Sequence, residues 1–97
     1  MPQRLSTIPS KPGVYVFNDT KQKVLYVGKA KNLRNRIRSY FQKKSGLDPR
    51  KASMMRDVHD FSYIVTGNEL EAFVLEANLI KQYKPRFNII LRDDKNY

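Results

Sequence analysis

The stretch GVYVFNDTKQKVLYVGKAK, residues 13–31, contains two short apolar runs separated by a polar loop. The runs GVYVF (13–17) and VLYVG (24–28) have the aromatic and β-branched content of strands. The polar residues 18–23 between them are typical of a hairpin loop. The stretch therefore predicts a β-hairpin in which each strand has a tyrosine beside a glycine, followed at once by a strongly basic segment.

The pairing of the two strands decides where the tyrosines lie. We expect Phe17 to pair with Val24. In that register Tyr15 lies opposite Tyr26, and their hydroxyls project together because cross-strand partners in an antiparallel pair share a face. A register shifted by one residue would separate them. The opposite face would carry Val14, Val16, Leu25 and Val27.

Composition indicates one small domain with a polyanionic partner. The 97 residues are 40% hydrophobic, which is enough for one core and too little for two. The 19 Lys and Arg exceed the 9 Asp and Glu, which gives a formal charge of +10. Such a charge favours nucleic acid, and an anionic membrane is the weaker alternative. Because the ending DDKNY has no terminator signal, we expect residues 1–97 to be one domain of a longer protein.

Location and metal chemistry are also limited by composition. The sequence has no run of about 20 apolar residues and no apolar stretch at its amino terminus, so we expect a cytoplasmic protein that stays out of membranes. It has no cysteine and one histidine. Disulfides and thiolate metal sites are excluded, and any metal ion should be a hard cation with oxygen ligands.

Two helices are predicted after the hairpin. Asn32 is a suitable N-cap for a helix over residues 33–41. Its apolar stripe is Leu33, Ile37, Tyr40 and Phe41. Asp48 and Pro49 predict the start of the second helix. Its buried stripe is expected to be Ala52, Met55, Val58 and His59.

The remaining segments complete an α+β pattern. Residues 61–66 are predicted as a third strand. A longer helix follows, capped by Asn68 or by a capping box, and it continues to about Tyr83 before Pro85 ends it. Residues 87–91 are predicted as a short strand. The order predicts a small antiparallel sheet, made of the amino-terminal hairpin and a later strand, flanked by helices.

Glu76 is a carboxylate on the apolar side of the long helix. At about 100° per residue it lies nearly opposite the polar row of Glu71, Asn78 and Gln82. Burying an unpaired carboxylate costs several kcal/mol, so Glu76 requires a partner. A structural salt bridge to a basic side chain and ligation of a metal cation both remain open.

Arg36 differs from its basic neighbours on the first helix. It lies beside Tyr40 at one edge of the apolar stripe, whereas Arg34 and Arg38 flank the other edge. It is either one of several solvated charges that bind phosphate or a fork of donors that stabilises a phosphate under attack.

The tyrosines permit a chemical and a structural interpretation. A tyrosine titrates near 10, so Tyr26 can act as a general base at neutral pH only beside positive charge or a metal-bound water. Lys29, Arg36 and a cation at Glu76 are candidate sources of that charge. Without them, Tyr15 and Tyr26 are cross-strand packing residues. The alternative role of Lys29 is to hold a phosphate rather than to lower the proton affinity of Tyr26.

The chain resembles the GIY-YIG nuclease family, whose name records two tripeptides that occur here as GVY (13–15) and YVG (26–28). The segments YVGKAKNLRNRIRSY (26–40) and EAFVLEANLIK (71–81) are similar to the UvrC branch of that family. The resemblance covers nearly the whole chain, and the motifs together are highly specific. Valine replaces isoleucine in both tripeptides, which keeps a β-branched packing residue.

The resemblance implies an endonuclease that hydrolyses one DNA phosphodiester with a single divalent cation, Mg²⁺ or Mn²⁺, bound by Glu76. It implies that Tyr26 is the general base and that Lys29 assists it. By the same resemblance Tyr15 organises the water and metal shell, and Arg36 stabilises the transition state. The further positions that match the active site of the family are Tyr40 and Asn88.

The resemblance also implies a substrate and partners. The UvrC branch cuts damaged double-stranded DNA on the 3′ side of a lesion in nucleotide excision repair, with UvrB loaded onto the damage by UvrA. We expect a monomeric domain with those partners. A stand-alone or homing-type GIY-YIG endonuclease and a non-catalytic DNA-binding module are the alternatives. The residues expected to contact DNA are Lys29, Lys31, Arg34, Arg36 and Arg38.

Overall fold

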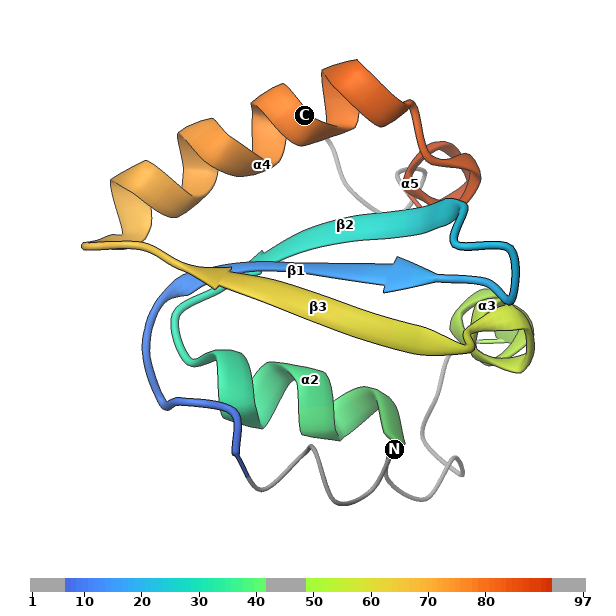
Figure 1. Ribbon diagram of the computed structural model, residues 1–97, viewed down its shortest axis with the longest axis horizontal. Helices are drawn as coiled ribbons and strands as arrows, with labels where there is room; N and C mark the ends of the chain where they lie inside the picture. Colours follow the sequence, from blue (N-terminus) through green and yellow to red (C-terminus); the bar gives the residue numbers. More distant parts are fainter. Residues whose placement is uncertain (1–6, 42–48, 92–97) are drawn as a thin grey trace.

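A three-stranded antiparallel sheet in the order β2-β1-β3 forms the centre of the domain, with α2 and α4 on opposite sides (Figure 1). The structure, a computed structural model, describes residues 7–41 and 49–91. Its elements are β1 (Gly13–Asn18), β2 (Val24–Ala30), α2 (Leu33–Phe41), α3 (Pro49–Asp57), β3 (Asp60–Val65), α4 (Glu69–Tyr83) and α5 (Arg86–Leu91). This architecture confirms the predicted α+β class.

The register of the hairpin differs from the expected one by two residues. Phe17 pairs with Tyr26 rather than with Val24, and Tyr15 pairs with Gly28. The expected register is wrong because an irregularity directly after Phe17 leaves an extra residue on β2. A shift of two residues leaves Tyr15 and Tyr26 on one face, so they remain together as diagonal neighbours.

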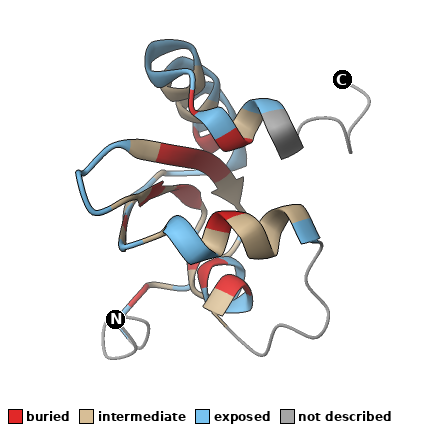
Figure 2. Cartoon of the chain, turned by 90° about the vertical axis from the view of Figure 1, so that its right-hand side faces the viewer, coloured by how far each residue is buried: buried red, intermediate tan, exposed pale blue. Residues whose placement is uncertain are grey.

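Two apolar clusters form the core. Buried residues concentrate on the strands and on the inward sides of the helices (Figure 2). The larger cluster joins the hairpin to α2, α3 and α5 and contains Ile8, Tyr15, Phe17, Leu25, Tyr26, Leu33, Ile37, Tyr40, Met54, Phe61 and Phe87. The smaller cluster, Val14, Val27 and Ala72, lies under α4. Leu25 was expected beside Val14 and Val27, but it belongs to the larger cluster because it is the extra residue of β2.

The helices α2 and α4 begin and end as predicted. α2 spans Leu33–Phe41, and the Asn32 side chain accepts a hydrogen bond of 3.1 Å from the backbone N–H of Asn35. α4 is capped by Asn68, whose side chain accepts from Glu71, so Asn68 rather than the capping box starts this helix. Within residues 7–41 and 49–91, no helix is long and apolar enough to cross a membrane.

Two expected segments are corrected by the structure. Residues 86–91 form the helix α5 instead of a strand, because a short apolar run does not by itself distinguish strand from helix. In α3 the fully buried side chain is Met54, whereas His59 lies beyond the helix and is exposed. The predicted cap Asp48 lies outside the described residues.

Both glycines of the paired tripeptides are required by close packing. A Cβ atom on Gly13 would lie closer than 3.0 Å to the carbonyl oxygen of Ile64 and to the side chain of Leu33. A Cβ atom on Gly28 would overlap the ring of Tyr15. These glycines therefore let β3, α2 and the tyrosine ring approach the hairpin backbone.

The packing at Gly13 can be tested with a matched pair of substitutions. We expect Gly13→Ala to lower the free energy of unfolding by about 1–3 kcal/mol, because backbone atoms of β3 must move. Gly67→Ala is the control, since its Cβ would meet only the flexible carboxylate of Glu71. Urea denaturation of both variants measures the difference. Equal losses would show that the close approach at Gly13 does not limit packing.

Candidate active site

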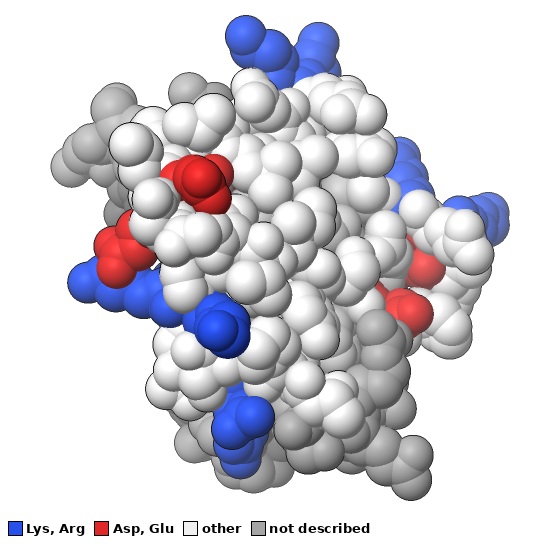
Figure 3. Space-filling model, turned by 60° about the vertical axis from the view of Figure 1, so that its left-hand side comes forward, with Lys and Arg blue, Asp and Glu red and all other residues white. Residues whose placement is uncertain are grey.

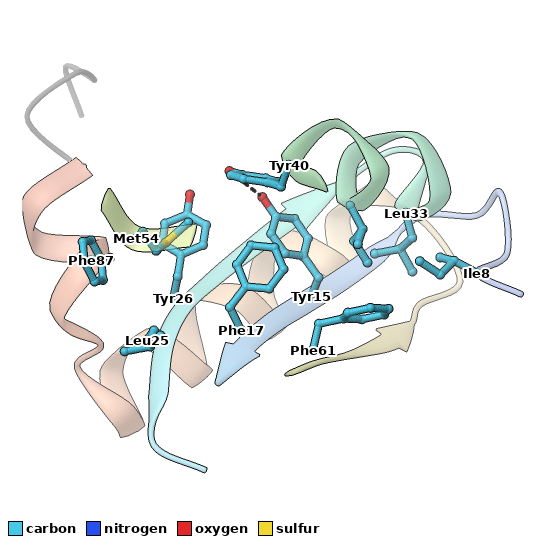
Figure 4. Packing of buried hydrophobic residues seen from close by; sticks show 11 residues of the cluster. Ile8, Tyr15, Phe17, Leu25, Tyr26, Leu33, Tyr40, Met54, Phe61 and Phe87 are labelled. Atoms are coloured by element: carbon cyan, nitrogen blue, oxygen red, sulfur yellow. Dashed lines mark hydrogen bonds between the residues drawn. The ribbon is translucent and has the colours of Figure 1, made fainter. Parts of the chain in front are cut away.

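Three tyrosines from three elements bring their hydroxyls together on the larger cluster (Figure 4). Tyr15 comes from β1, Tyr26 from β2 and Tyr40 from the last turn of α2. The hydroxyls of Tyr15 and Tyr40 are 3.3 Å apart and share a hydrogen bond. The ring centroid of Tyr26 lies 6.1 Å from that of Tyr15 and 6.5 Å from that of Tyr40. We call Tyr15, Tyr26 and Tyr40 the phenol cluster.

Burial keeps the protons on this cluster. Desolvation is the largest cause that raises the pKa of the Tyr15 and Tyr26 hydroxyls well above the ordinary value. Interaction with Tyr40 raises both values further, because neighbouring phenols cannot both become anions easily. The guanidinium of Arg36 opposes this effect on both tyrosines. Within the described residues, the positive charge of Arg36 thus favours deprotonation of these tyrosines, but burial and the neighbouring phenols outweigh it.

Arg36 extends from α2 toward the same hydroxyls. Interaction with Tyr15 is the largest cause that raises the pKa of this guanidinium, and a hydrogen bond to Tyr15 contributes. Tyr40 and Tyr26 act in the same direction. Arg36 is exposed on its other side and lines the main pocket. The sequence-based distinction between Arg36 and its basic neighbours is therefore reflected in the structure.

Glu76 approaches the cluster from α4. Its carboxylate raises the pKa of the Tyr26 hydroxyl, which places a negative charge near that phenol. Glu76 is half-buried, rather than enclosed in the core. Within residues 7–41 and 49–91, no three His, Cys, Asp or Glu side chains gather as a metal-binding group. A cation held here by residues of the described ranges would therefore have at most two such side chains as ligands.

A pocket of about 580 Å³ lies between α2 and the first turns of α4. Its cationic lining residues are Lys29, Lys31 and Arg36, and α4 contributes Glu69 and Ala72. The ammonium of Lys29 lies 5.8 Å from the ring centroid of Phe73 on α4. Because Lys29 and Tyr26 are three residues apart on β2, their side chains leave opposite faces of the strand.

Two predicted DNA-binding arginines lie apart from the pocket lining. Arg34 donates its Nε–H to the carbonyl oxygen of Ile8 at 2.7 Å, which ties the segment before β1 to α2. Arg38 is exposed and does not line the pocket. Of the five basic residues predicted to contact DNA, Lys29, Lys31 and Arg36 are therefore brought together and Arg34 and Arg38 are not.

Asn88 fastens the edge strand that carries Tyr26. Its side-chain oxygen accepts from the N–H of Val27 at 2.8 Å, and its amide donates to the carbonyl of Val27 at 2.8 Å. This two-point contact satisfies one residue of the unpaired edge of β2 next to Tyr26. Sequence reasoning matched Asn88 to the site only by resemblance, because nothing local indicated that α5 would meet β2.

Solved structures place the fold and the site in a known class. The GIY-YIG N-terminal endonuclease domain of UvrC from Thermotoga maritima, bound to its catalytic divalent cation magnesium, matches with a TM-score of 0.79 and 39% identity. The match covers 90% of this chain and 93% of that one. Point mutants of that domain with a tyrosine replaced by phenylalanine, or an asparagine by alanine, match at 38% identity and a TM-score of 0.78. The sheet and the site define a GIY-YIG nuclease domain.

Comparison of sequences narrows the class to one family. The family described as UvrC-like GIY-YIG domain matches residues 11–89. UvrABC system protein C of Caldicellulosiruptor saccharolyticus is 54% identical over 95 residues, and that of Gloeobacter violaceus is 56% identical over 95 residues. Each alignment covers 98% of this chain and 16% or 15% of the relative. The chain belongs to the UvrC-like GIY-YIG family and spans about one sixth of the length of these relatives.

The buried phenols predict a loss of stability in alkali. The folded-state pKa of Tyr26 is raised, so its contribution is complete below about pH 10, the pKa of an unfolded tyrosine, and decreases as pH rises above it. We expect Tyr26→Phe to flatten the fall in unfolding free energy between roughly pH 9 and pH 11. Tyr83→Phe, which removes an exposed phenol, should keep the wild-type slope. Urea denaturation at several pH values in this range measures the unfolding free energy. An identical pH dependence for Tyr26→Phe and Tyr83→Phe would contradict the prediction.

Proposed function

We propose that this domain hydrolyses a DNA phosphodiester with one divalent cation, Mg²⁺ or Mn²⁺, held by Glu76. The observation that carries the proposal is the meeting of Glu76, Tyr26 and Arg36, which come from three different elements and act on one phenol cluster. A ligand for a hard cation, a proton acceptor and a phosphate-binding fork are the groups that phosphodiester hydrolysis requires. The magnesium bound by the Thermotoga maritima domain supports the choice of metal.

The donor set fits such a cation. A site with fewer than three His, Cys, Asp or Glu side chains among the described residues, and with a phenol near Glu76, suits Mg²⁺, which keeps several waters and takes few protein ligands. A bound cation would supply Lewis-acid polarisation of the phosphate and help the leaving oxygen. Weak affinity in the absence of DNA follows, because phosphate oxygens would complete the ligand set.

Tyr26 is the general base in this proposal. Its proton must leave at the hydroxyl oxygen, and burial, Tyr40 and Glu76 all oppose that loss. Arg36 acts in the favourable direction, and neutralising the charge of Glu76 removes one opposing contribution. Tyr15 orders the cluster through its hydrogen bond to Tyr40. Asn88 acts by positioning, since it holds the backbone next to Tyr26.

The basic residues divide between chemistry and substrate binding. Lys29 and Lys31 line the pocket beside Arg36, where they would hold the phosphates on either side of the scissile one. Lys29 leaves β2 on the face opposite Tyr26, so phosphate binding is favoured over direct assistance to that tyrosine. Arg34 and Arg38 would add weaker contacts from the outer side of α2.

In the cell, we propose the role that the relatives suggest. As part of UvrABC system protein C, the domain would cut damaged double-stranded DNA on the 3′ side of a lesion in the cytoplasm, as a monomeric module acting after UvrA has loaded UvrB. The formal charge of +10 and the basic pocket support a DNA substrate. Damage recognition would come from those partners, since the pocket presents phosphate-binding groups.

Removing either central group should abolish cutting. We expect Glu76→Gln and Tyr26→Phe to reduce cleavage of lesion-containing duplex in Mg²⁺ by at least about 100-fold while DNA affinity stays within about threefold. The assay uses the full-length protein with its partners and follows the 3′ cut on a gel, after circular dichroism has confirmed folding. Undiminished 3′ cutting by both variants would show that the active site lies elsewhere.

Two arginines of α2 provide a matched comparison. We expect Arg36→Ala to lower the cleavage rate at saturating DNA by about 100-fold, because this guanidinium reaches the phenol cluster. Arg38→Ala should leave that rate unchanged and weaken binding by a few fold, since it removes only a surface charge. Single-turnover rates and binding measured against salt concentration separate the two effects. Equal rate losses would contradict the special position of Arg36.

A further inference from the structure

An apolar stripe occupies the outer face of α4, where a surface helix is usually polar. Leu70, Phe73 and Val74 are exposed by 69%, 53% and 49%. At about 100° per residue Leu70 and Val74 point away from Ala72, which packs on the sheet, and Phe73 points to the side. Exposed apolar side chains that lie next to one another mark a binding surface more often than isolated ones do. We call Leu70, Phe73 and Val74 the α4 stripe.

The α4 stripe begins at the rim of the basic pocket. Ala72 lines the pocket, and Phe73 follows it on the helix. The ammonium of Lys29, which also lines the pocket, lies 5.8 Å from the ring centroid of Phe73. Around the helix axis, Phe73 is nearest to the pocket side and Val74 is farthest. The ring therefore lies beside the Lys29 ammonium at one edge of the α4 stripe.

The charge distribution separates two kinds of contact. Figure 3 brings forward the side of the molecule on which β3 ends and α4 begins, and its middle is a broad white expanse with both blue and red side chains around it. An expanse of that kind has no cationic side chain to attract phosphates. Bases, in contrast, have apolar faces that stack on aromatic rings.

We propose that the α4 stripe contacts nucleobases of bound DNA and that Phe73 stacks on an unstacked base beside the phosphate held by Lys29. This inference rests on the proposed nuclease function and names the feature of the substrate that the site prefers. Nucleobases become accessible where a duplex is opened or kinked, and apolar side chains inserted there hold the deformed form. The domain thus favours DNA whose stacking is already disturbed next to the cut.

The position of the α4 stripe next to the basic pocket favours DNA as the molecule that covers it. A strand seated with one phosphate at Lys29 and Arg36 must leave the pocket past its rim, and α4 forms that rim with Glu69 and Ala72. Lys29 belongs to both surfaces, because it lines the pocket and covers Phe73. A protein partner is the other occupant, and the experiment below separates that outcome.

The test uses the Glu76→Gln chain, in which DNA should stay uncut. Phe73→Ala is made in this background together with Val65→Ala, an equally simple truncation of a 43% exposed side chain on β3. Val65 lies on the sheet face of Phe61 and Tyr63, opposite to α4. Fluorescence anisotropy gives Kd for a fully paired duplex and for the same duplex with a short mismatch bubble, and 2-aminopurine in the bubble reports stacking.

We expect Phe73→Ala to weaken binding of the bubble by about tenfold, to change binding of the paired duplex by less than about twofold, and to abolish quenching of 2-aminopurine. The salt dependence should stay as in the parent, because phosphate contacts are intact. Val65→Ala should match the parent in every measurement.

Three results would overturn the proposal. If Phe73→Ala and Val65→Ala have the same Kd for each DNA, the stripe does not contact DNA. In that case cleavage by the wild type would still support the nuclease function. Equal loss on both DNAs with a shallower salt slope would place the effect on phosphate binding. If the parent chain binds neither DNA at low salt and the wild type does not cut, both the nuclease proposal and this one fail.

Discussion

The packing of the Tyr15 ring against the bare backbone of Gly28 is the contact on which the site depends. A Cβ atom at Gly28 would overlap that ring, so the ring can lie flat across β2 only over glycine. From there its hydroxyl reaches Tyr40 on α2. The two tripeptides therefore fit together sterically. The first provides the ring of Tyr15, and Gly28 of the second leaves room for that ring. The pairing of Tyr15 with Gly28 thus positions the phenol cluster.

Electrostatics then set the resting state of the site. Burial holds the protons on Tyr15 and Tyr26, and the carboxylate of Glu76 reinforces this effect at Tyr26. Arg36 opposes it without overcoming it. Such a balance makes the basicity of Tyr26 depend on what neutralises Glu76 and on the charge that substrate and cation bring. In the proposed mechanism, the cation and the phosphate would therefore have to offset these effects before Tyr26 could accept a proton.

Local signals predicted most of the fold, and long-range packing accounts for the errors. Capping residues and apolar spacing placed α2 and α4 correctly, because both signals lie within a few residues. The register failed because the extra residue on β2 is set by the packing of Leu25 in the larger cluster. The helical face of Glu76 singled it out in the sequence, and its role as a metal ligand stays a prediction. The contact of Asn88 depends on α5 meeting β2, which no local pattern indicates.

The most direct test of the account is to locate a bound cation by nuclear magnetic resonance. Mn²⁺ broadens nearby resonances, so a titration into the isotopically labelled chain shows which side chains surround the ion. We predict that ring signals of Tyr26 broaden first, that side-chain signals of the exposed Ile64 and Val65 on β3 stay sharp, and that Glu76→Gln removes the selectivity. Selective broadening that survives in Glu76→Gln, or broadening centred away from Tyr26, would contradict the assignment of Glu76 as the metal ligand of this site.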